Sequence, residues 1–121
     1  MTKRIMYLTY EEVVAINKEV LSSIKVKKAD AFKVLSSLKI RNALDEVKQV
    51  KGDVYDKAAV LLTGLIQSHP FASGNRRTAI LATIKFLRMN GTDPKFKETA
   101  KMLQGVRENY YSNKEIKEWL M

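Results

Sequence analysis

Apolar residues recur every three or four positions along most of the chain, a spacing that places them on one face of an α-helix. Six stretches follow this spacing, and they predict helices over residues 10–24, 32–47, 53–68, 75–89, 93–103 and 112–120. Residues 4–8 are also rich in apolar side chains, and they fit either an edge strand or an extended lead-in to the first helix. The pattern therefore predicts an all-α fold with at most a minor β element.

Polar residues mark where several of these helices begin. Thr9 stands three positions before Glu12, and Ser112 stands three positions before Glu115. This spacing is a capping box, in which each side chain satisfies a free backbone amide of the other residue. Asp53 is a third N-terminal capping residue, because its carboxylate can accept hydrogen bonds from the first amides of a helix.

The second and fifth helices have less regular patterns. The apolar face of the second is interrupted by a break near residue 40, and its members are Phe32, Leu35, Leu38, Leu44 and Val47. The fifth is expected to begin at Asp93 and Pro94, which suit the capping and first-turn positions. Its apolar face comprises Phe96, Ala100 and Leu103.

The third helix has the widest apolar face, which predicts a place in the centre of the core. The members of this face are Tyr55, Ala58, Ala59, Leu62, Leu65 and Ile66. Pro70 disfavours helical backbone at His69, so the helix is expected to end there. The fourth helix should begin at Asn75 or Arg76 after a short loop. His69 therefore lies where a central helix gives way to that loop.

Length and composition indicate one soluble domain covering residues 1–121. Hydrophobic residues make up 45% of the chain and charged residues 29%. No apolar run reaches the roughly 18 to 20 residues of a membrane span, and the N-terminal segment turns acidic before a signal-peptide core can form. We therefore expect a cytoplasmic protein without a membrane partner.

The absence of cysteine excludes disulfides, thiolate catalysis and zinc sites built on sulfur. A single histidine excludes a metal centre built on several imidazoles. The chain has 22 Lys and Arg against 13 Asp and Glu, a formal net charge of +9. This charge attracts nucleic acid, nucleotide phosphates or acidic proteins without choosing among them, and solubility is an alternative explanation for it.

Candidate chemistry gathers between the third and fourth helices. Gly74 and Asn75 precede a helix start, where free backbone amides can hold an anion. Arg76 and Arg77 add two guanidinium groups that suit phosphate oxygens. His69, at the other end of the loop, can take a proton from a hydroxyl near neutral pH. Each feature also has an ordinary structural explanation, namely a helix cap, a turn and a solvated surface, but together they predict transfer of a phosphate-containing group to a hydroxyl.

The segment HPFASGNRR, residues 69–77, closely resembles the signature of the Fic/Doc family. That signature reads His, often Pro, Phe, any residue, Asp or Glu, Gly or Ala, Asn, Gly or Lys, and Arg. The following TAILATIKFLRMNG and the opening YLTYEEVVAIN are similar to the Doc, or death-on-curing, branch. The resemblance implies a compact Fic/Doc-type helical domain.

The resemblance also implies roles for individual residues. His69 would be the general base, Gly74, Asn75 and Arg76 would line an anion hole, and Arg77 would hold the phosphates of ATP, the donor. Phe71 and Ser73 belong to the same nucleotide-binding segment, although Phe71 also suits a buried anchor of the loop. Most family members transfer AMP, whereas the Doc branch is associated with transfer of the terminal phosphate.

Two positions favour the Doc branch, and a third departs from the family. Arg76 is a cation where adenylylating members prefer Gly, and Ile80 stands where they usually carry a second Arg. Ser73 replaces the Asp or Glu that holds the divalent metal, and a neutral hydroxyl is a poor Mg²⁺ ligand. We therefore assign no metal ligand, although the family implies Mg²⁺.

Partners follow from the same resemblance. Doc-like toxins are usually held inactive by a separate antitoxin, and the inhibitory motif of many Fic proteins is not found in this sequence. An acidic antitoxin acting in trans and a target protein with a hydroxyl, such as a translation factor, are the expected partners. Two alternatives remain open: a catalytically degenerate member that only binds nucleotide or a partner, and, less favoured, a basic nucleic-acid-binding module.

Overall fold

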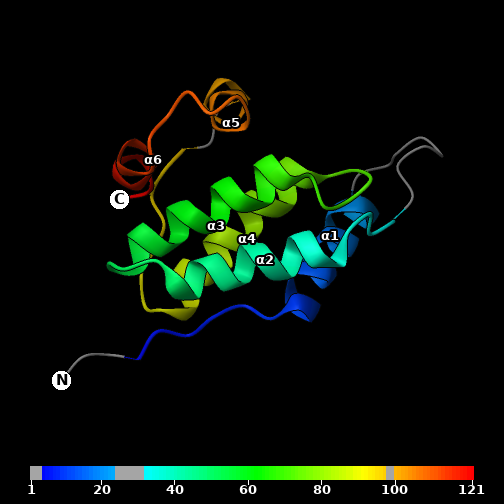
Figure 1. The fold of residues 1–121 in the computed structure, drawn as a ribbon, viewed down its shortest axis with the longest axis horizontal. Coiled ribbons are helices and arrows are strands. Elements are labelled where there is room, and N and C mark those ends of the chain that lie inside the picture. The colour runs from blue at the N-terminus through cyan, green and yellow to red at the C-terminus, as the bar shows by residue number, and fades with distance from the viewer. Residues whose placement is uncertain (1–3, 24–31, 98–99) are drawn as a thin grey trace.

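The computed structural model describes residues 4–23, 32–97 and 100–121, and their regular structure is helical (Figure 1). The helices are α1 (Tyr10–Ser23), α2 (Ser37–Gln49), α3 (Val54–Ser68), α4 (Asn75–Met89), α5 (Ala100–Arg107) and α6 (Asn113–Leu120). The β structure within these ranges is a single isolated antiparallel bridge, Val34 with Phe71. The predicted all-α fold with at most a minor β element is confirmed.

Capping side chains fix several helix starts where the sequence placed them. Thr9 N–H donates to Glu12 Oε1 at 3.1 Å, and Glu12 N–H donates back to Thr9 Oγ1 at 3.2 Å. Ser112 and Glu115 form the equivalent pair at the start of α6. Asp53 accepts from two amides of α3. These bonds are local, so they form wherever the spacing occurs at a helix start.

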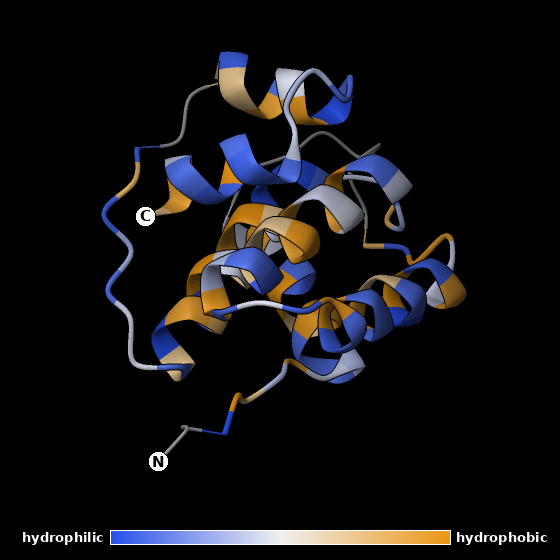
Figure 2. Ribbon diagram, turned by 60° about the vertical axis from the view of Figure 1, so that its left-hand side comes forward, coloured by the Kyte–Doolittle hydropathy of each residue, from blue (hydrophilic) through white to orange (hydrophobic). Residues whose placement is uncertain are grey.

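Helix α3 lies in the centre of the fold and packs against α2, α4, α5 and α6. Figure 2 shows hydrophobic residues gathered in the middle of the ribbon, where α3 and α4 meet. The buried apolar side chains of α3 are Ala58, Ala59, Leu61, Leu62, Leu65 and Ile66. Their wide stripe explains the central position, because a helix that is apolar over most of its surface must be covered on several sides.

The prediction that the second helix begins at residue 32 and breaks near residue 40 is wrong. Residues 32–36 are not helical, and α2 runs without a break from Ser37 through Ile40. The amides of Leu35 and Ser36 both donate to the carbonyl of Pro70, at 2.8 and 3.2 Å. The backbone of this segment therefore bonds to a distant loop, and Phe32, Leu35 and Leu38 are exposed although they have helical spacing.

The predicted start of the fifth helix is also wrong. Residues 93–97 are not helical, and α5 begins at Ala100, just after two residues outside the described ranges. The Phe96 ring packs on Trp119 of α6, with ring centroids 4.9 Å apart. The indole N–H of Trp119 donates to the Lys97 carbonyl at 3.2 Å. A contact from another helix thus holds this segment in a non-helical form.

A buried lysine of α3 caps the C-terminal end of α2, and the sequence did not predict this contact. Lys57 of α3 is 6% exposed, and its ammonium group donates to the carbonyls of Val47 and Val50 at 3.1 and 2.7 Å. The last carbonyls of a helix have no partner within it. Lys57 supplies that partner and joins α2 to α3.

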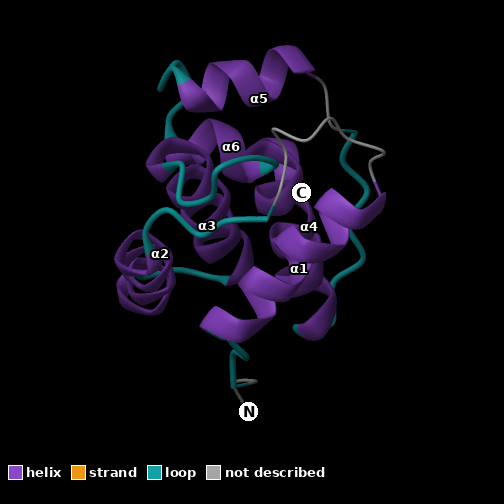
Figure 3. Ribbon diagram, turned by 90° about the vertical axis from the view of Figure 1, so that its right-hand side faces the viewer, coloured by secondary structure: helices purple, strands orange, loops and turns teal. Residues whose placement is uncertain are grey.

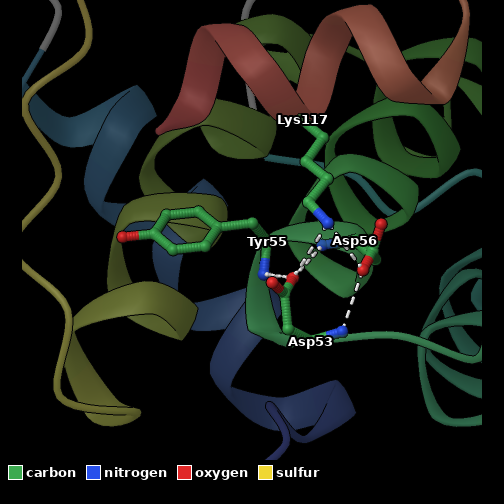
Figure 4. Close-up of polar contacts among 4 residues, drawn as sticks. All are labelled: Asp53, Tyr55, Asp56 and Lys117. Atoms are coloured by element: carbon green, nitrogen blue, oxygen red, sulfur yellow. Dashed lines mark hydrogen bonds and ion pairs between the residues drawn. The ribbon is translucent and has the colours of Figure 1, made fainter.

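Helices α5 and α6 lie at one end of the molecule, and the N-terminal segment lies at the other (Figure 3). Figure 4 shows how α6 is attached to the start of α3. Lys117 Nζ lies 3.0 Å from Asp56 Oδ2 and 3.5 Å from Asp53 Oδ1. The carboxylates that cap α3 therefore also hold α6.

Candidate functional site

The histidine lies at the end of α3 in an unusual backbone conformation. His69 is the C-terminal cap of α3, with φ 54° and ψ 55°, in the left-handed region. Its side chain is exposed, whereas Pro70 directly after it is buried. Residues other than glycine rarely adopt positive φ, although His does so more readily than most. The chain therefore turns sharply here and leaves the imidazole open to solvent.

The side chain of Asn75 holds the loop from inside. Asn75 is 5% exposed, its Oδ1 accepts from the Phe71 amide at 3.0 Å, and its Nδ2 donates to the Phe71 carbonyl at 2.8 Å. Both backbone groups of one loop residue are thus satisfied by one side chain. The Phe71 ring is 1% exposed and belongs to the core. The Phe71 ring and the Asn75 side chain are therefore both buried, and together they hold the loop.

Residues 33–36 hold the loop from outside. Besides the two bonds to the Pro70 carbonyl, the Ala72 amide donates to the Lys33 carbonyl at 2.9 Å. These bonds produce the Val34–Phe71 bridge. The loop between His69 and Gly74 is therefore anchored on both sides through its backbone.

The start of α4 is formed by a glycine and a cationic first turn. Gly74 is its N-cap, with φ 76°, and glycine has no side chain that could cap the helix. The positive end of a helix dipole favours a bound anion. Arg76 and Arg77 follow in the first turn with exposed side chains. Gly74, Asn75, Arg76 and Arg77 therefore lie together at the start of α4, and His69 lies at the other end of the loop. A phosphate cradle at this helix start stays a prediction.

Pockets lie at both ends of the loop. One of about 320 Å³ is lined by Gln67 and Ser68, next to His69, and by residues of α2. Another of about 430 Å³ is lined by Arg77 and by Glu19 and its neighbours in α1. Neither pocket is lined by a residue of the loop from His69 to Gly74.

The loop has few side chains that could bind a divalent cation. Residues 69–77 contain no carboxylate, and Ser73 stands at the position of the family's acid. Within residues 4–23, 32–97 and 100–121, no three side chains of His, Cys, Asp or Glu form a group that could hold a metal. Two cations at the start of α4 oppose a further positive charge. The residues present do not fit the Mg²⁺ site of the family.

These features can be compared with known protein families. The pattern of the Fic/DOC family matches residues 7–87, which include α3, the loop and all but the last two residues of α4. The chain belongs to the Fic/DOC family. Members of this family generally transfer a nucleotidyl or phosphate group to proteins, and the matched region contains all the site residues predicted from the sequence.

The comparison with curated proteins gives no match. In the part of the chain that the structure describes, no helix is long and apolar enough to cross a membrane. The family assignment therefore rests on the match over residues 7–87.

Sequence reasoning missed the residues that hold the site in place. Residues 33–36 carry no motif, and they act through backbone groups that any sequence possesses. Asn17 of α1 reaches the loop from more than fifty positions away in the chain, with its Nδ2 on the Ser73 carbonyl. Its one available signal was a polar residue within the apolar stripe of α1.

Proposed function

We propose that this Fic/DOC protein transfers a phosphate-containing group from ATP to a hydroxyl of a target protein. The observation that supports the proposal is an exposed His69 at the end of α3, joined to the glycine and two arginines at the start of α4 by a loop whose backbone is bonded to residues 33–36 and to Asn75. A base and an anion site held at a fixed separation are what such a transfer requires.

The chain's own residues would divide the work. His69 would accept the proton of the attacking hydroxyl as its oxygen forms a bond to phosphorus. The amides at the start of α4, with Arg76 and Arg77, would stabilise negative charge on the phosphoryl oxygens. If the terminal phosphate is transferred, its bond to the β-phosphate breaks and ADP leaves; if AMP is transferred, the bond between the α- and β-phosphates breaks and pyrophosphate leaves.

Transfer of the terminal phosphate is the better supported of the two reactions. Ile80, at the position where adenylylating members usually have a second arginine, is 2% exposed. A residue buried in the core there supplies no cation to a triphosphate. Arg76 adds a cation at a position where those members prefer glycine. This distribution of charge matches the Doc branch.

A toxin of a toxin–antitoxin pair is the biological role that we propose. The net charge of +9 would speed association with an acidic antitoxin acting in trans, because opposite charges steer encounter. A translation factor is a plausible class of target, as it is for the Doc branch. The proposal places both the antitoxin and the target at the exposed loop around His69.

Ser73 supports a second candidate, a degenerate member that binds nucleotide or a partner without chemistry. A neutral hydroxyl is a far poorer Mg²⁺ ligand than a carboxylate, and the metal normally stabilises charge on the phosphates. In the first candidate, Arg76 and Arg77 offset this loss. In the second they bind nucleotide only.

The test is transfer of label from ATP to proteins of a cell extract. The purified protein is incubated with extract and Mg²⁺, and with ATP labelled at either the terminal or the α-phosphate. His69→Asn is the inactive control, because Asn tolerates positive φ and removes the base with little backbone strain.

Each result selects one function. Label from the terminal phosphate that is absent with His69→Asn supports the kinase, and label from the α-phosphate supports an adenylyltransferase. Transfer from neither donor, with activity gained in Ser73→Asp, supports the degenerate member. Salt-sensitive binding to DNA or RNA that is unchanged by His69→Asn would instead favour a nucleic-acid-binding protein.

A further inference from the structure

Asn17 is a buried polar residue of α1 that the proposed chemistry does not use. Its side chain is 0% exposed. Its Nδ2 donates to the Ser73 carbonyl at 2.9 Å and to Thr78 Oγ1 at 3.0 Å. These acceptors lie on either side of Gly74, the N-cap of α4. One side chain of α1 therefore joins the last part of the loop to the first turn of the following helix.

Burying the Asn17 side chain costs free energy that an apolar side chain at the same position would not. Oδ1 of Asn17 is buried and has no hydrogen-bond partner among the described residues. A buried polar atom without a partner is less favourable than an apolar group of the same shape. If α1 only packed against α4, a leucine would fill the position better. The two donated bonds are what the asparagine adds.

The backbone at Gly74 also lies close to α1. A Cβ atom at this position would stand 3.3 Å from Asn17 Nδ2 and 3.2 Å from Val20 Cγ1. Helix α1 thus limits how far the loop can move inward, and the bonds from Asn17 limit how far it can move outward. The start of α4 is held at one distance from α1.

We propose that Asn17 is a positioning residue, which holds the start of α4 so that its amides and Arg76 keep their place relative to His69. The inference rests on the proposed function, because it assigns Asn17 to the anion site of that reaction. It acts through Ser73 and Thr78 and touches no substrate.

The test compares Asn17→Leu with Val13→Ala in the full chain. Val13 is fully buried one helical turn earlier in α1, so its truncation weakens the same helix without touching the loop. The first readout is amide hydrogen exchange at Thr78, whose amide bonds to the Gly74 carbonyl. The second is the affinity for ATP, followed by the amide shifts of Gly74 and Arg76.

In Asn17→Leu we expect Thr78 exchange to quicken and ATP affinity to fall, each by about tenfold, the change that one lost hydrogen bond produces in an equilibrium constant. Val13→Ala should change neither by more than its general loss of stability. Equal exchange at Thr78 in the two variants would overturn the proposal. Thr78→Val removes the hydroxyl that accepts from Asn17, and it replaces Asn17→Leu if that variant does not fold. Unchanged exchange of the amide at position 78 in Thr78→Val would also overturn the proposal.

The two readouts separate this inference from the proposed function. If the wild-type protein does not bind ATP, the proposed function fails, but exchange at Thr78 still tests whether Asn17 holds the helix start. If ATP binds equally well to wild type and Asn17→Leu while exchange quickens, the positioning role in binding is refuted and the proposed function stands.

Discussion

Replacing Asn75 by Leu should loosen the loop that carries the candidate site. The side chain of Asn75 makes two hydrogen bonds with the Phe71 backbone, at 3.0 and 2.8 Å, and is 5% exposed. Leucine has nearly the same shape and can make neither bond. The Phe71 amide and carbonyl then lose the two bonds that Asn75 makes with them.

The magnitude follows from those two backbone groups. Leaving a buried donor or acceptor without a partner costs about 1–3 kcal/mol. With two such groups, partly offset by the gain from burying an apolar side chain, we expect the free energy of unfolding to fall by about 3 kcal/mol. Because Phe71 belongs to the core, the loss should appear in global unfolding as well as in the loop.

Urea unfolding followed by circular dichroism measures the change. Thr83→Val is the matched control, because Thr83 is also buried in α4 but donates its hydroxyl to the Ala79 carbonyl of the same helix. Removing that bond leaves no backbone amide without a partner, so we expect the free energy of unfolding to fall by less than about 1 kcal/mol. A loss below about 0.5 kcal/mol in Asn75→Leu would refute the conclusion that Asn75 holds the loop.

Three further changes test other parts of the structure. Ser73→Asp should raise Mg²⁺-dependent transfer by about tenfold or more in the labelled-ATP assay, because a carboxylate restores a metal ligand. Gly105→Ala should lower the free energy of unfolding by about 2 kcal/mol in urea, because its Cβ would overlap the Tyr111 ring. A hydrogen bond with Lys117 lowers the pKa of Asp56 below 3.8, and the same bond raises the pKa of Lys117 above 10.5. The free energy of unfolding should therefore fall as the pH drops below 3.8 and as it rises above 10.5. In Lys117→Met, urea unfolding at a series of pH values should show a smaller fall at both extremes.

Contrary outcomes would be specific. If Ser73→Asp binds Mg²⁺ without any gain in transfer, the metal does not limit activity. A wild-type stability for Gly105→Ala would mean that the Tyr111 ring moves freely. If the stability of Lys117→Met falls at low and high pH as much as that of the wild type, other groups set the pH dependence.

Signals for helix ends were readable in the sequence because they depend on residues a few positions apart. The Thr9–Glu12 box, the Asp53 cap and the stop imposed by Pro70 all appear in the structure where the spacing predicted them. The motif at residues 69–77 likewise identified the family, since its residues are contiguous.

The same local reading failed where distant segments compete for backbone groups. Leu35 and Ser36 donate to the Pro70 carbonyl, so the helical spacing around them is overridden. Lys97 is held by Trp119 in the same way. Local propensity is worth a few tenths of a kcal/mol per residue, and bonds to other elements exceed it.

The sequence by itself determined the helical class, most helix starts, the apolar face of α3 and the contiguous set of residues that carries the candidate chemistry. Only the tertiary structure decided how that set is used. It turned the Asn75 side chain inward to Phe71, placed residues 33–36 and Asn17 against the loop, and buried Ile80. The physical reason is that each of these features depends on a hydrogen bond or a packing contact with a segment whose position is fixed by the core as a whole.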